Sequence, residues 1–314
     1  MNLFEYTYTL VRQIPPKRLS TYGAVAEALG DKRAARAVGR MMNQNPDADT
    51  MPCFKIVYSD GSLGGFGLGI EDKIRRIQND GISIKDGNIV EFNQVFFNDF
   101  KTNFPLKKLQ IEQQKMSTQI ILKDEITHPI KIVGGIDVAY PKNEFEPACA
   151  AYVAIDIETR DITEKHYSYK ESIFPYIPGY LSYREVPVIE AVMKKITTPP
   201  QILMIDGNGI LHPRKCGIAC HIGIKYNIPT IGVAKRKLLG ENTNDHVLVD
   251  GEIRARSLIT GQARNPIYIS PGHRISLNTS YKITKQLCRV KNPEPLRQAH
   301  RAAQERLLQK RQIS

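Results

Sequence analysis

The sequence lacks the features that mark membrane-bound and secreted proteins. No apolar run approaches the ~20 residues that a membrane-spanning helix needs. The opening stretch MNLFEYTYTLVRQIPP has neither the basic start nor the apolar centre of a signal peptide. Cysteines are few, and their odd number, 5, and irregular spacing do not form a disulfide framework. We expect a soluble, cytoplasmic protein with reduced thiols and no membrane partner.

Acidic residues are outnumbered, and the imbalance is uneven along the chain. The net charge is +12. Residues 1–91 carry 12 Lys and Arg against 11 Asp and Glu, whereas residues 92–314 carry 32 against 21. A basic surface suits a polyanionic partner such as nucleic acid. Charge alone does not show that the protein binds nucleic acid, because many basic proteins never do. We infer no protein partner from the sequence.

The 314 residues, 41% of them hydrophobic, are enough for two domains with ordinary cores. The first part predicts short helices. Phe4, Tyr8, Val11 and Ile14 recur at helical spacing before Pro15-Pro16 ends the helix. A second helix follows a Ser20 or Thr21 cap and ends at Gly30, and Asp31 caps a third.

In the third helix, KRAARAVGRMM, the arginines share one face, and Ala34, Val38 and Met41 share another. Two short helices joined in this way, the second with an arginine face, form a helix-turn-helix pattern. The competing interpretation is a solvated basic face on an ordinary helix.

Turn residues predict the domain limits. Five glycines in residues 60–70 require a loop, a helix follows near 72–79, and Asp86-Gly87-Asn88 is a plausible boundary. We therefore expect a first domain over 1–88, a linker over 89–103 and a second domain over 104–314. The second domain should open with a helix over 104–123 and continue as α/β, because the apolar strands 130–140, 148–156, 201–209 and 229–239 alternate with helical segments. Its last segment, PLRQAHRAAQERLLQKRQ, predicts an amphipathic helix packed on the domain.

Two acidic residues lie in these buried strands. Asp137 lies within the first strand and Asp206 ends another, and two like charges held together are costly unless a cation neutralises them. A hard cation held in this way activates water and stabilises the oxyanions of phosphodiester cleavage. Glu185 is a candidate third carboxylate, and His273 a candidate ligand or proton carrier.

Five ordered stretches resemble endonuclease V: VGGIDVAY, FPYIPGYLSYRE, DGNGILHPRKCGIACHIG, GVAKRKL and ISPGHRISL. They cover roughly residues 100–290. The resemblance implies a ribonuclease-H-like fold and Mg²⁺-dependent cleavage, with Mn²⁺ as a substitute. Its expected target is DNA, double- or single-stranded, that contains deaminated bases, above all hypoxanthine, with uracil and xanthine as further candidates. The family cuts the second phosphodiester bond on the 3′ side of the lesion. Inosine-containing RNA is the alternative substrate, since some members of this family cut it.

The same resemblance assigns residue roles. Asp137 and Asp206 match the metal ligands. Tyr176, in PYIP, matches the family's wedge residue, which fills the gap in the base stack when the damaged base turns out. The remaining matches are Glu185, which supports the metal site; His273, which assists the hydrolytic water; Lys235, which neutralises the scissile phosphate; and His212 and Arg214, phosphate or metal-shell contacts.

Cys216, Cys220 and His221 superficially suggest zinc. Four ligands at suitable spacing are not evident, and the two thiols fall one helical turn apart, so we predict a packed helix here.

The first part resembles the DNA-binding and active-site domain of O6-alkylguanine-DNA alkyltransferases, over residues 1–82. The stretches that carry the resemblance are IPPKRLSTYGAVAEALG, AARAVGRMMNQNP, PCFKIV and SDGSLGGFGLG. The resemblance implies a mainly α, winged-helix-like domain. Cys53 matches the alkyl acceptor, Arg36 the finger that enters the stack, Tyr22 the residue that crowds the 3′ phosphate and Asn45 the brace of the active-site turn.

The match departs at the acceptor itself. The family has Pro-Cys-His-Arg, whereas Phe54 and Lys55 follow Cys53 here, and Asp80 stands in place of Glu. Without the histidine, a thiol keeps a pKa near ~8.5 and is mostly protonated at neutral pH. We expect a bifunctional repair enzyme, with Cys53 a working but slower acceptor. The alternative for this domain is a non-catalytic module that recognises alkylated bases.

Overall fold

The computed structural model describes residues 1–45, 47–126, 128–141, 146–261 and 263–313. Two compact units are distinguished in it. The first comprises Met1–Ile111 with Ile173–Pro178, and the second comprises Glu112–Ser172 with Gly179–Ser314. The helix α6, Pro105–Ser117, begins in the first unit and ends in the second. Each unit is described by itself below. None of the described helices is long and apolar enough to cross a membrane.

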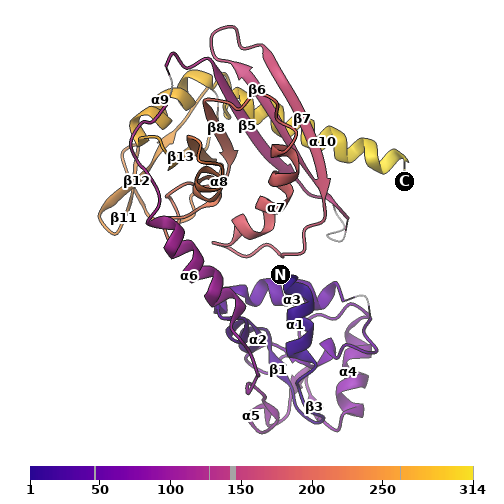
Figure 1. The fold of residues 1–314 in the computed structure, drawn as a ribbon. Coiled ribbons are helices and arrows are strands. Elements are labelled where there is room, and N and C mark those ends of the chain that lie inside the picture. Colours follow the sequence, from indigo (N-terminus) through magenta and orange to yellow (C-terminus); the bar gives the residue numbers. More distant parts are fainter. Residues whose placement is uncertain (46, 127, 142–145, 262, 314) are drawn as a thin grey trace. The chain divides into compact units, whose positions relative to one another are not determined.

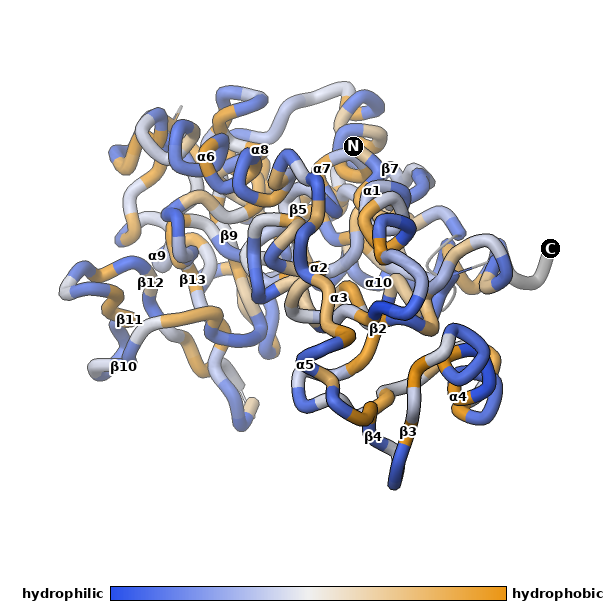
Figure 2. The backbone as a smooth tube through the Cα atoms, turned by 90° about the horizontal axis from the view of Figure 1, so that it is seen from below, coloured by the Kyte–Doolittle hydropathy of each residue, from blue (hydrophilic) through white to orange (hydrophobic). Residues whose placement is uncertain are grey.

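The first unit is mainly helical (Figure 1). Its short strands pair two by two, β1 with β2 in parallel and β3 with β4 as an antiparallel hairpin. Glycine-rich residues 58–69 form the predicted loop between β2 and α4. The tube of α4 alternates between hydrophobic and hydrophilic colours, as an amphipathic helix should (Figure 2). The elements are α1 (Leu3–Val11), β1 (Ser20–Thr21), α2 (Tyr22–Leu29), α3 (Ala35–Asn43), β2 (Ile56–Val57), α4 (Ile70–Asn79), β3 (Ile84–Lys85), β4 (Asn88–Ile89) and α5 (Phe92–Val95).

Local signals set the two helices of the helix-turn-helix pattern. The Thr21 side chain caps α2 by accepting from the Ala24 amide, and Gly30 ends it at φ 102°, a conformation that glycine adopts without strain. Asp31 caps a single 3₁₀ turn, Lys32–Ala34, which then continues as α3. The predicted inner face is confirmed, because Val38 and Met41 are fully buried.

The first unit extends beyond the predicted limit at residue 88. The Asp86-Gly87 turn, expected to be a boundary, is instead the tip of the β3–β4 hairpin. Residues 89–103, expected to be a linker, pack onto this unit: the Leu19 amide donates to the Val95 carbonyl (2.9 Å), and the Phe97 amide donates to Leu19 (2.7 Å). Asp-Gly-Asn occurs both in the turns of β-hairpins and in linkers between domains, so these three residues do not tell which of the two structures forms.

The second unit contains a mixed sheet, nine-stranded in its described part, with the order β10-β11-β12-β13-β9-β8-β5-β6-β7. The central strands β9, β8 and β5 are parallel, and the flanking strands are antiparallel. This α/β architecture agrees with the fold class expected from the sequence. The strands are β5 (Ile132–Ala139), β6 (Ala148–Asp156), β7 (Ile162–Lys170), β8 (Ile202–Asp206), β9 (Thr230–Ala234), β10 (Glu241–Thr243), β11 (His246–Val249), β12 (Glu252–Leu258) and β13 (Ile267–His273).

Helices cover both faces of this sheet. Two of them, α7 (Leu181–Met193) and α8 (Ile218–Tyr226), close one core, and α9 (Leu277–Leu287) and α10 (Glu294–Ile313) close the other. Strands β5 to β7 run side by side between α7 and α10 (Figure 1). Alternate residues of β6 belong to the two cores, which explains why this strand is apolar throughout.

A glycine allows α10 to lie directly on β5. A Cβ atom at Gly135 would come 2.4 Å from the carbonyl carbon of Pro295, closer than any side chain tolerates. The helix therefore begins in contact with the strand, two residues before Asp137. The buried Ala299, Ala302 and Ala303 continue this close packing.

Candidate active sites

Asp137 and Asp206 lie at the same level of neighbouring strands. In the parallel pair β5–β8, Ile136 is opposite Ile205, so the next residue of each strand is an aspartate. Side chains alternate between the faces of a strand, and Ala139 and Met204 belong to the core beneath α10. Both aspartates therefore point to the face that α10 covers, as a shared site requires.

The carboxylates affect one another electrostatically. Burial raises the pKa of Asp206 to about 6, the charge of Asp137 adds to the rise, and Lys235 opposes it. Burial, followed by the charges of Asp137 and Asp206, raises the pKa of Glu185 on α7 well above its usual range. Three acidic groups thus share one poorly solvated region.

Lys235 directly follows β9, where Val233 is opposite Asp206. Its Nζ lies 2.5 Å from Asp206 Oδ2. Burial lowers the pKa of Lys235, but the pairing with Asp206 outweighs it, so the net pKa rises. The structure thus brings together four of the predicted residues: Asp137, Glu185, Asp206 and Lys235.

His300 on α10 also reaches this site, and the sequence reasoning missed it. Its Nδ1 lies 2.6 Å from Asp137 Oδ2, and this hydrogen bond raises the pKa of the imidazole. The usable signal was indirect. The last helix has small residues such as Ala299, and the strand has the Gly134-Gly135 pair. These small residues indicate that the helix and the strand approach closely, which brings His300 next to Asp137.

The donor set suits a hard divalent cation. Carboxylate oxygens are the preferred ligands of Mg²⁺ and Mn²⁺, and a cation would offset the mutual repulsion that raises the pKa values of Asp206 and Glu185. Among the residues that the structure describes, no three His, Cys, Asp or Glu side chains form a closed metal-binding group. Asp206 and Asp137 are instead engaged by Lys235 and His300.

His273 is not brought to the carboxylates, contrary to the role expected for it. At the end of β13 it lies opposite Thr230, which pairs with Leu203 at the far end of β8 from Asp206. Its Nδ1 accepts from the Ile121 amide at 3.3 Å, and burial lowers the pKa of its ring. His273 is therefore a buried, neutral imidazole away from the carboxylates, and its contact with Ile121 joins the sheet to the segment after α6.

His212 and Arg214 make structural contacts within the second unit, and their expected phosphate or metal-shell role stays a prediction. Both donate to the carbonyl oxygen of Gly179, at 3.0 Å from His212 Nε2 and 2.6 Å from Arg214 Nη2. The predicted wedge, Tyr176, precedes Gly179 by three residues, and its side chain is 47% exposed.

Cys216 and Cys220 are buried, reduced and packed with Ile210 at the start of α8. This is the packed helix that the spacing predicted.

In the first unit, Cys53 is a buried thiol beside an amide donor. It begins the 3₁₀ turn Cys53–Lys55 and is only 3% exposed. Asn45 Nδ2 lies 3.2 Å from its Sγ and also donates to the carbonyls of Asp47 and Met51. Asn45 thus contacts both the thiol and the loop before it, as a brace would.

Burial raises the pKa of the Cys53 thiol, and the hydrogen bond from Asn45 opposes it only in part. Lys55 does not help, because its Nζ points away to Asp80 (2.8 Å) and to the Pro15 carbonyl. The cations that favour the thiolate, Lys73 and Arg76, come from α4 instead. Phe54, at the position of the family's histidine, packs in the apolar core with Val57.

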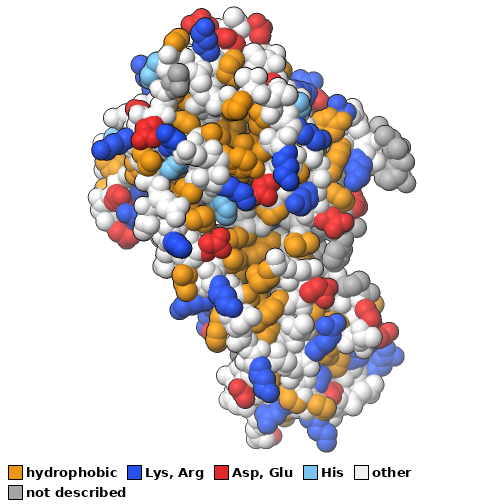
Figure 3. Space-filling model, in the orientation of Figure 1, with side chains coloured by type: hydrophobic (Ala, Val, Ile, Leu, Met, Phe, Trp, Pro, Cys, Tyr) orange, Lys and Arg blue, Asp and Glu red, His pale blue; other side chains and the backbone are white. Residues whose placement is uncertain are grey.

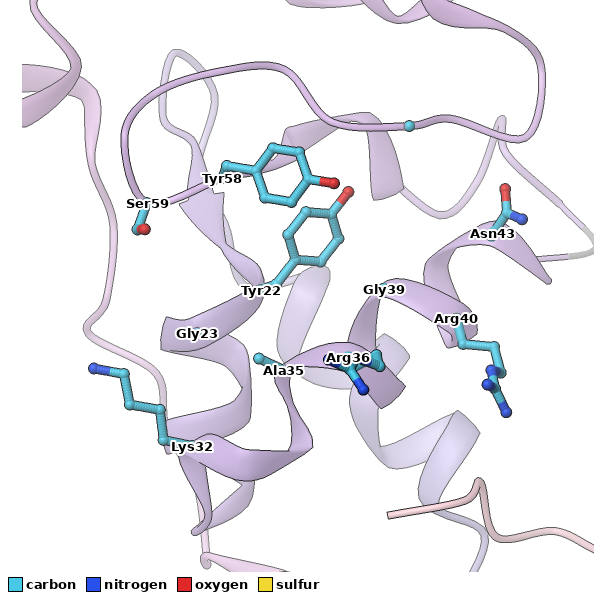
Figure 4. Close-up of a pocket in the computed structure, with 11 residues that line it drawn as sticks. Tyr22, Gly23, Lys32, Ala35, Arg36, Gly39, Arg40, Asn43, Tyr58 and Ser59 are labelled. Carbon is cyan, nitrogen blue, oxygen red and sulfur yellow. The ribbon is translucent and has the colours of Figure 1, made fainter. Parts of the chain in front are cut away.

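Tyr22 and Arg36 line one open cavity of about 810 Å³ (Figure 4). The centre of the Tyr58 ring lies 5.4 Å from that of Tyr22, and the two hydroxyl groups lie at the same end of this pair. Arg36, Arg40 and Lys32 supply positive charge around the aromatic pair. The residues that line this cavity do not include Cys53, although burial, Tyr58 and then Cys53 raise the pKa of Tyr22 to about 12.

Lys and Arg side chains are dispersed among acidic and hydrophobic ones on the visible face of each unit (Figure 3). That face of neither unit shows a continuous basic band.

Comparison with known proteins finds a family match for each of two parts of the chain. The family model "Endonuclease V" matches residues 114–301, more than half of the chain. The chain belongs to the endonuclease V family. Residues 2–82 match a second model, "6-O-methylguanine DNA methyltransferase, DNA binding domain". Endonuclease V proteins are in general metal-dependent.

Relatives share both parts. The chain is 41% identical to a bifunctional methyltransferase/endonuclease of Picrophilus torridus, over 96% of this chain and 95% of the relative. The corresponding protein of Thermoplasma volcanium is 36% identical, over 91% and 84%. The two-domain repair enzyme expected from the sequence, an endonuclease combined with a methyltransferase domain, is thereby confirmed.

Solved endonuclease V structures match the second unit. Human endonuclease V aligns with a TM-score of 0.59 at 29% identity, over 65% of this chain and 99% of that one. Endonuclease V of Ciona intestinalis, crystallised with DNA that contains an inosine followed by a ribo-adenosine, aligns at 0.59 and 28%, over 65% and 98%. The endonuclease V fold, a mixed sheet with helices, is thus shown.

Proposed function

We propose that the second unit is a Mg²⁺-dependent endonuclease that cuts damaged DNA at the second phosphodiester bond 3′ to a deaminated base, above all hypoxanthine. The observation that carries this proposal is the proximity of Asp137 on β5, Asp206 at the end of β8 and Glu185 on α7. After burial, the charge of Asp137 raises the pKa values of both Asp206 and Glu185. The inosine-containing DNA bound by the Ciona relative supports the substrate class. Mn²⁺ is expected to replace Mg²⁺, because both accept oxygen ligands.

The chain's own groups have separate tasks in this proposal. Asp137 and Asp206 would hold the ion, which supplies Lewis acidity and an activated water when bound. Glu185 completes the acidic site. Lys235 neutralises charge on the scissile phosphate, and His300 orients Asp137 through its hydrogen bond. No such task falls to His273.

Removal of the metal tests the proposal. A 5′-labelled duplex with one hypoxanthine should be cut once, at the second bond 3′ to the lesion, in Mg²⁺ or Mn²⁺. Chelation should stop the reaction, because carboxylates alone do not stabilise an oxyanion. A duplex without the lesion serves as the control. Equal cutting of both duplexes, or cutting that persists in chelator, would reject the proposed function. An inosine-containing RNA in the same assay decides whether RNA is the better substrate.

Tyr176 is proposed to fill the stack after the damaged base turns out. The Tyr176→Ala variant should bind the hypoxanthine duplex roughly five- to hundredfold more weakly, since stacking contributes ~1–3 kcal/mol per base. Binding to the undamaged duplex should hardly change. The measurement is the anisotropy of labelled duplexes in Ca²⁺ instead of Mg²⁺. Equal losses on both duplexes would assign Tyr176 to packing.

We further propose that Cys53 accepts alkyl groups from O6-alkylguanine. The thiolate sulfur attacks the alkyl carbon, the S–C bond forms, and the C–O bond breaks. The guanine leaves with the bonding pair and takes up a proton, while the thiol proton passes to solvent. Asn45 places the sulfur by its hydrogen bond. Tyr22 and Arg36, around the open cavity, would turn the base out of the duplex. A recognition module without transfer is the alternative.

A further inference from the structure

His212, Arg214 and Gln113 converge on one backbone atom, the carbonyl oxygen of Gly179. His212 Nε2 lies 3.0 Å from this oxygen, Arg214 Nη2 2.6 Å and Gln113 Nε2 3.2 Å. We call these three side chains the Gly179 clamp. Three donors on a single carbonyl, one of them charged, hold a peptide more firmly than an ordinary loop contact does.

The clamp is internally braced. The Arg214 amide donates to His212 Nδ1, which leaves the proton of the neutral ring on Nε2, where it meets Gly179. Arg214 Nε donates to Gln113 Oε1 at 2.6 Å, and Gln113 also donates to the Cys216 carbonyl. Gln113 is fully buried, and His212 is 4% exposed.

The residue that is held must be glycine. Gly179 has φ +82°, and a Cβ atom there would lie 3.2 Å from Arg214 Nη2. A positive φ turns the carbonyl toward the three donors at no steric cost only for glycine. The guanidinium of Arg214 also lies 4.8 Å from the centre of the Tyr180 ring, so the next residue is fixed as well.

Gly179 lies in the chain between two residues of the proposed nuclease site. Tyr176 lies three residues before it, and α7, which carries Glu185, begins two residues after it. A shift of this peptide therefore moves the start of the helix with the third carboxylate, and it reaches Tyr176 along the chain through Ile177 and Pro178.

We infer that the Gly179 clamp is a positioning device that couples lesion recognition by Tyr176 to cleavage at Glu185, and that His212 and Arg214 act through it instead of contacting phosphate. This inference rests on the proposed nuclease function. It adds Gln113, on the helix that enters the second unit, to the residues that determine selectivity.

A fluorescence probe tests the clamp without any substrate. The protein contains no tryptophan, so a Tyr176→Trp variant has one indole, at the wedge position. In that background, His212→Asn, Arg214→Lys and Gln113→Leu should each lower the indole anisotropy and increase its quenching by acrylamide in the free protein. Lys165→Ala, on the exposed strand β7, is the matched control and should change neither.

Kinetics of the same substitutions in the natural Tyr176 background supply the second readout. Each clamp variant should lower kcat on the hypoxanthine duplex roughly ten- to hundredfold, because a misplacement of about 1 Å in a reacting group can cost about 10²-fold in rate. Affinity for the undamaged duplex should stay near the parent value. The thermal midpoint should fall, because each substitution leaves a buried group without its hydrogen-bond partner, so cleavage is compared at a temperature at which every variant is folded. Arg214→Lys is decisive, because lysine keeps the charge but loses the planar fork.

Two results would overturn the inference. The first is normal cleavage by Arg214→Lys, combined with an Arg214→Ala variant that binds both duplexes more weakly and with a smaller salt dependence, as a phosphate contact would. The second is an indole signal unaffected by all three substitutions. If the parent protein itself shows no preference for hypoxanthine, the proposed function fails, and the indole signal still decides whether the clamp orders the loop.

Discussion

Asp137→Ala and Asp206→Ala should each lower cleavage of a hypoxanthine duplex by more than about a thousandfold, while the protein stays folded. The loss is expected because the loss of one group that stabilises a developing oxyanion already costs about 10²–10³ in kcat. The two aspartates would act earlier, by holding the ion on which that stabilisation depends. Single-turnover cleavage in Mg²⁺ measures the effect.

Folding should survive because the site is electrostatically unfavourable. The pKa of Asp206 is about 6 in the folded protein, above its usual 3.8. The folded state therefore binds more protons than the unfolded state between about pH 4 and 6, and stability falls as the pH rises through that window. At pH 7.5 the ionised carboxylate costs stability, so Asp206→Asn in chelator should unfold at a temperature no lower than the parent. A strongly lowered thermal midpoint would mean that Asp206 stabilises the fold. Near-normal cutting by Asp137→Ala or by Asp206→Ala would show that the substituted aspartate is not a metal ligand.

Incubation with an O6-methylguanine duplex should add one methyl group to Cys53 and none to a Cys53→Ala variant. The reaction should be slow at neutral pH, because burial raises the pKa of the thiol and Phe54 replaces the histidine that would activate it. Well below the pKa, the thiolate fraction rises about tenfold per pH unit, so the rate should increase by about that factor from pH 7 to 8. Mass spectrometry of the intact protein and of its peptides measures the adduct.

The Phe54→His variant offers a matched gain of function. An imidazole at the position of the family's histidine should accept the thiol proton through water and raise the transfer rate at pH 7, while the dependence on pH becomes shallower. Tight binding of the lesion with Cys53 unmodified after long incubation, in the parent and in Phe54→His, would reject transfer. The first unit would then be the recognition module.

Local sequence signals predicted the parts of this fold that depend on neighbours in the chain. Thr21 and Gly30 limit α2 as cap residues do, and the apolar runs around Asp137 and Asp206 became adjacent strands. The carboxylate pair could be predicted because an aspartate in a buried strand is unusual wherever it occurs.

Contacts between distant segments could not be predicted in this way. His300 meets Asp137 across 163 residues, and the small residues of its helix, the indirect signal in the sequence, do not tell which strand the helix covers. The motif around His273 suggested chemistry, but the register of β13 against β9 places it opposite Thr230, away from the acidic site. The resemblance implies that Arg214 contacts phosphate or the metal shell, and the sequence gives no sign that it also binds Gln113 and Gly179 in its own unit.

We propose that one chain carries two separate repair chemistries, one at Asp206 and one at Cys53. A duplex with hypoxanthine and O6-methylguanine, placed far apart, tests this proposal in one reaction read both by strand length and by protein mass. The parent should cut the strand and gain one methyl group, Asp206→Ala should gain the methyl group without cutting, and Cys53→Ala should cut without gaining it. Loss of both activities in either folded variant, or a parent that never gains the methyl group, would contradict the account.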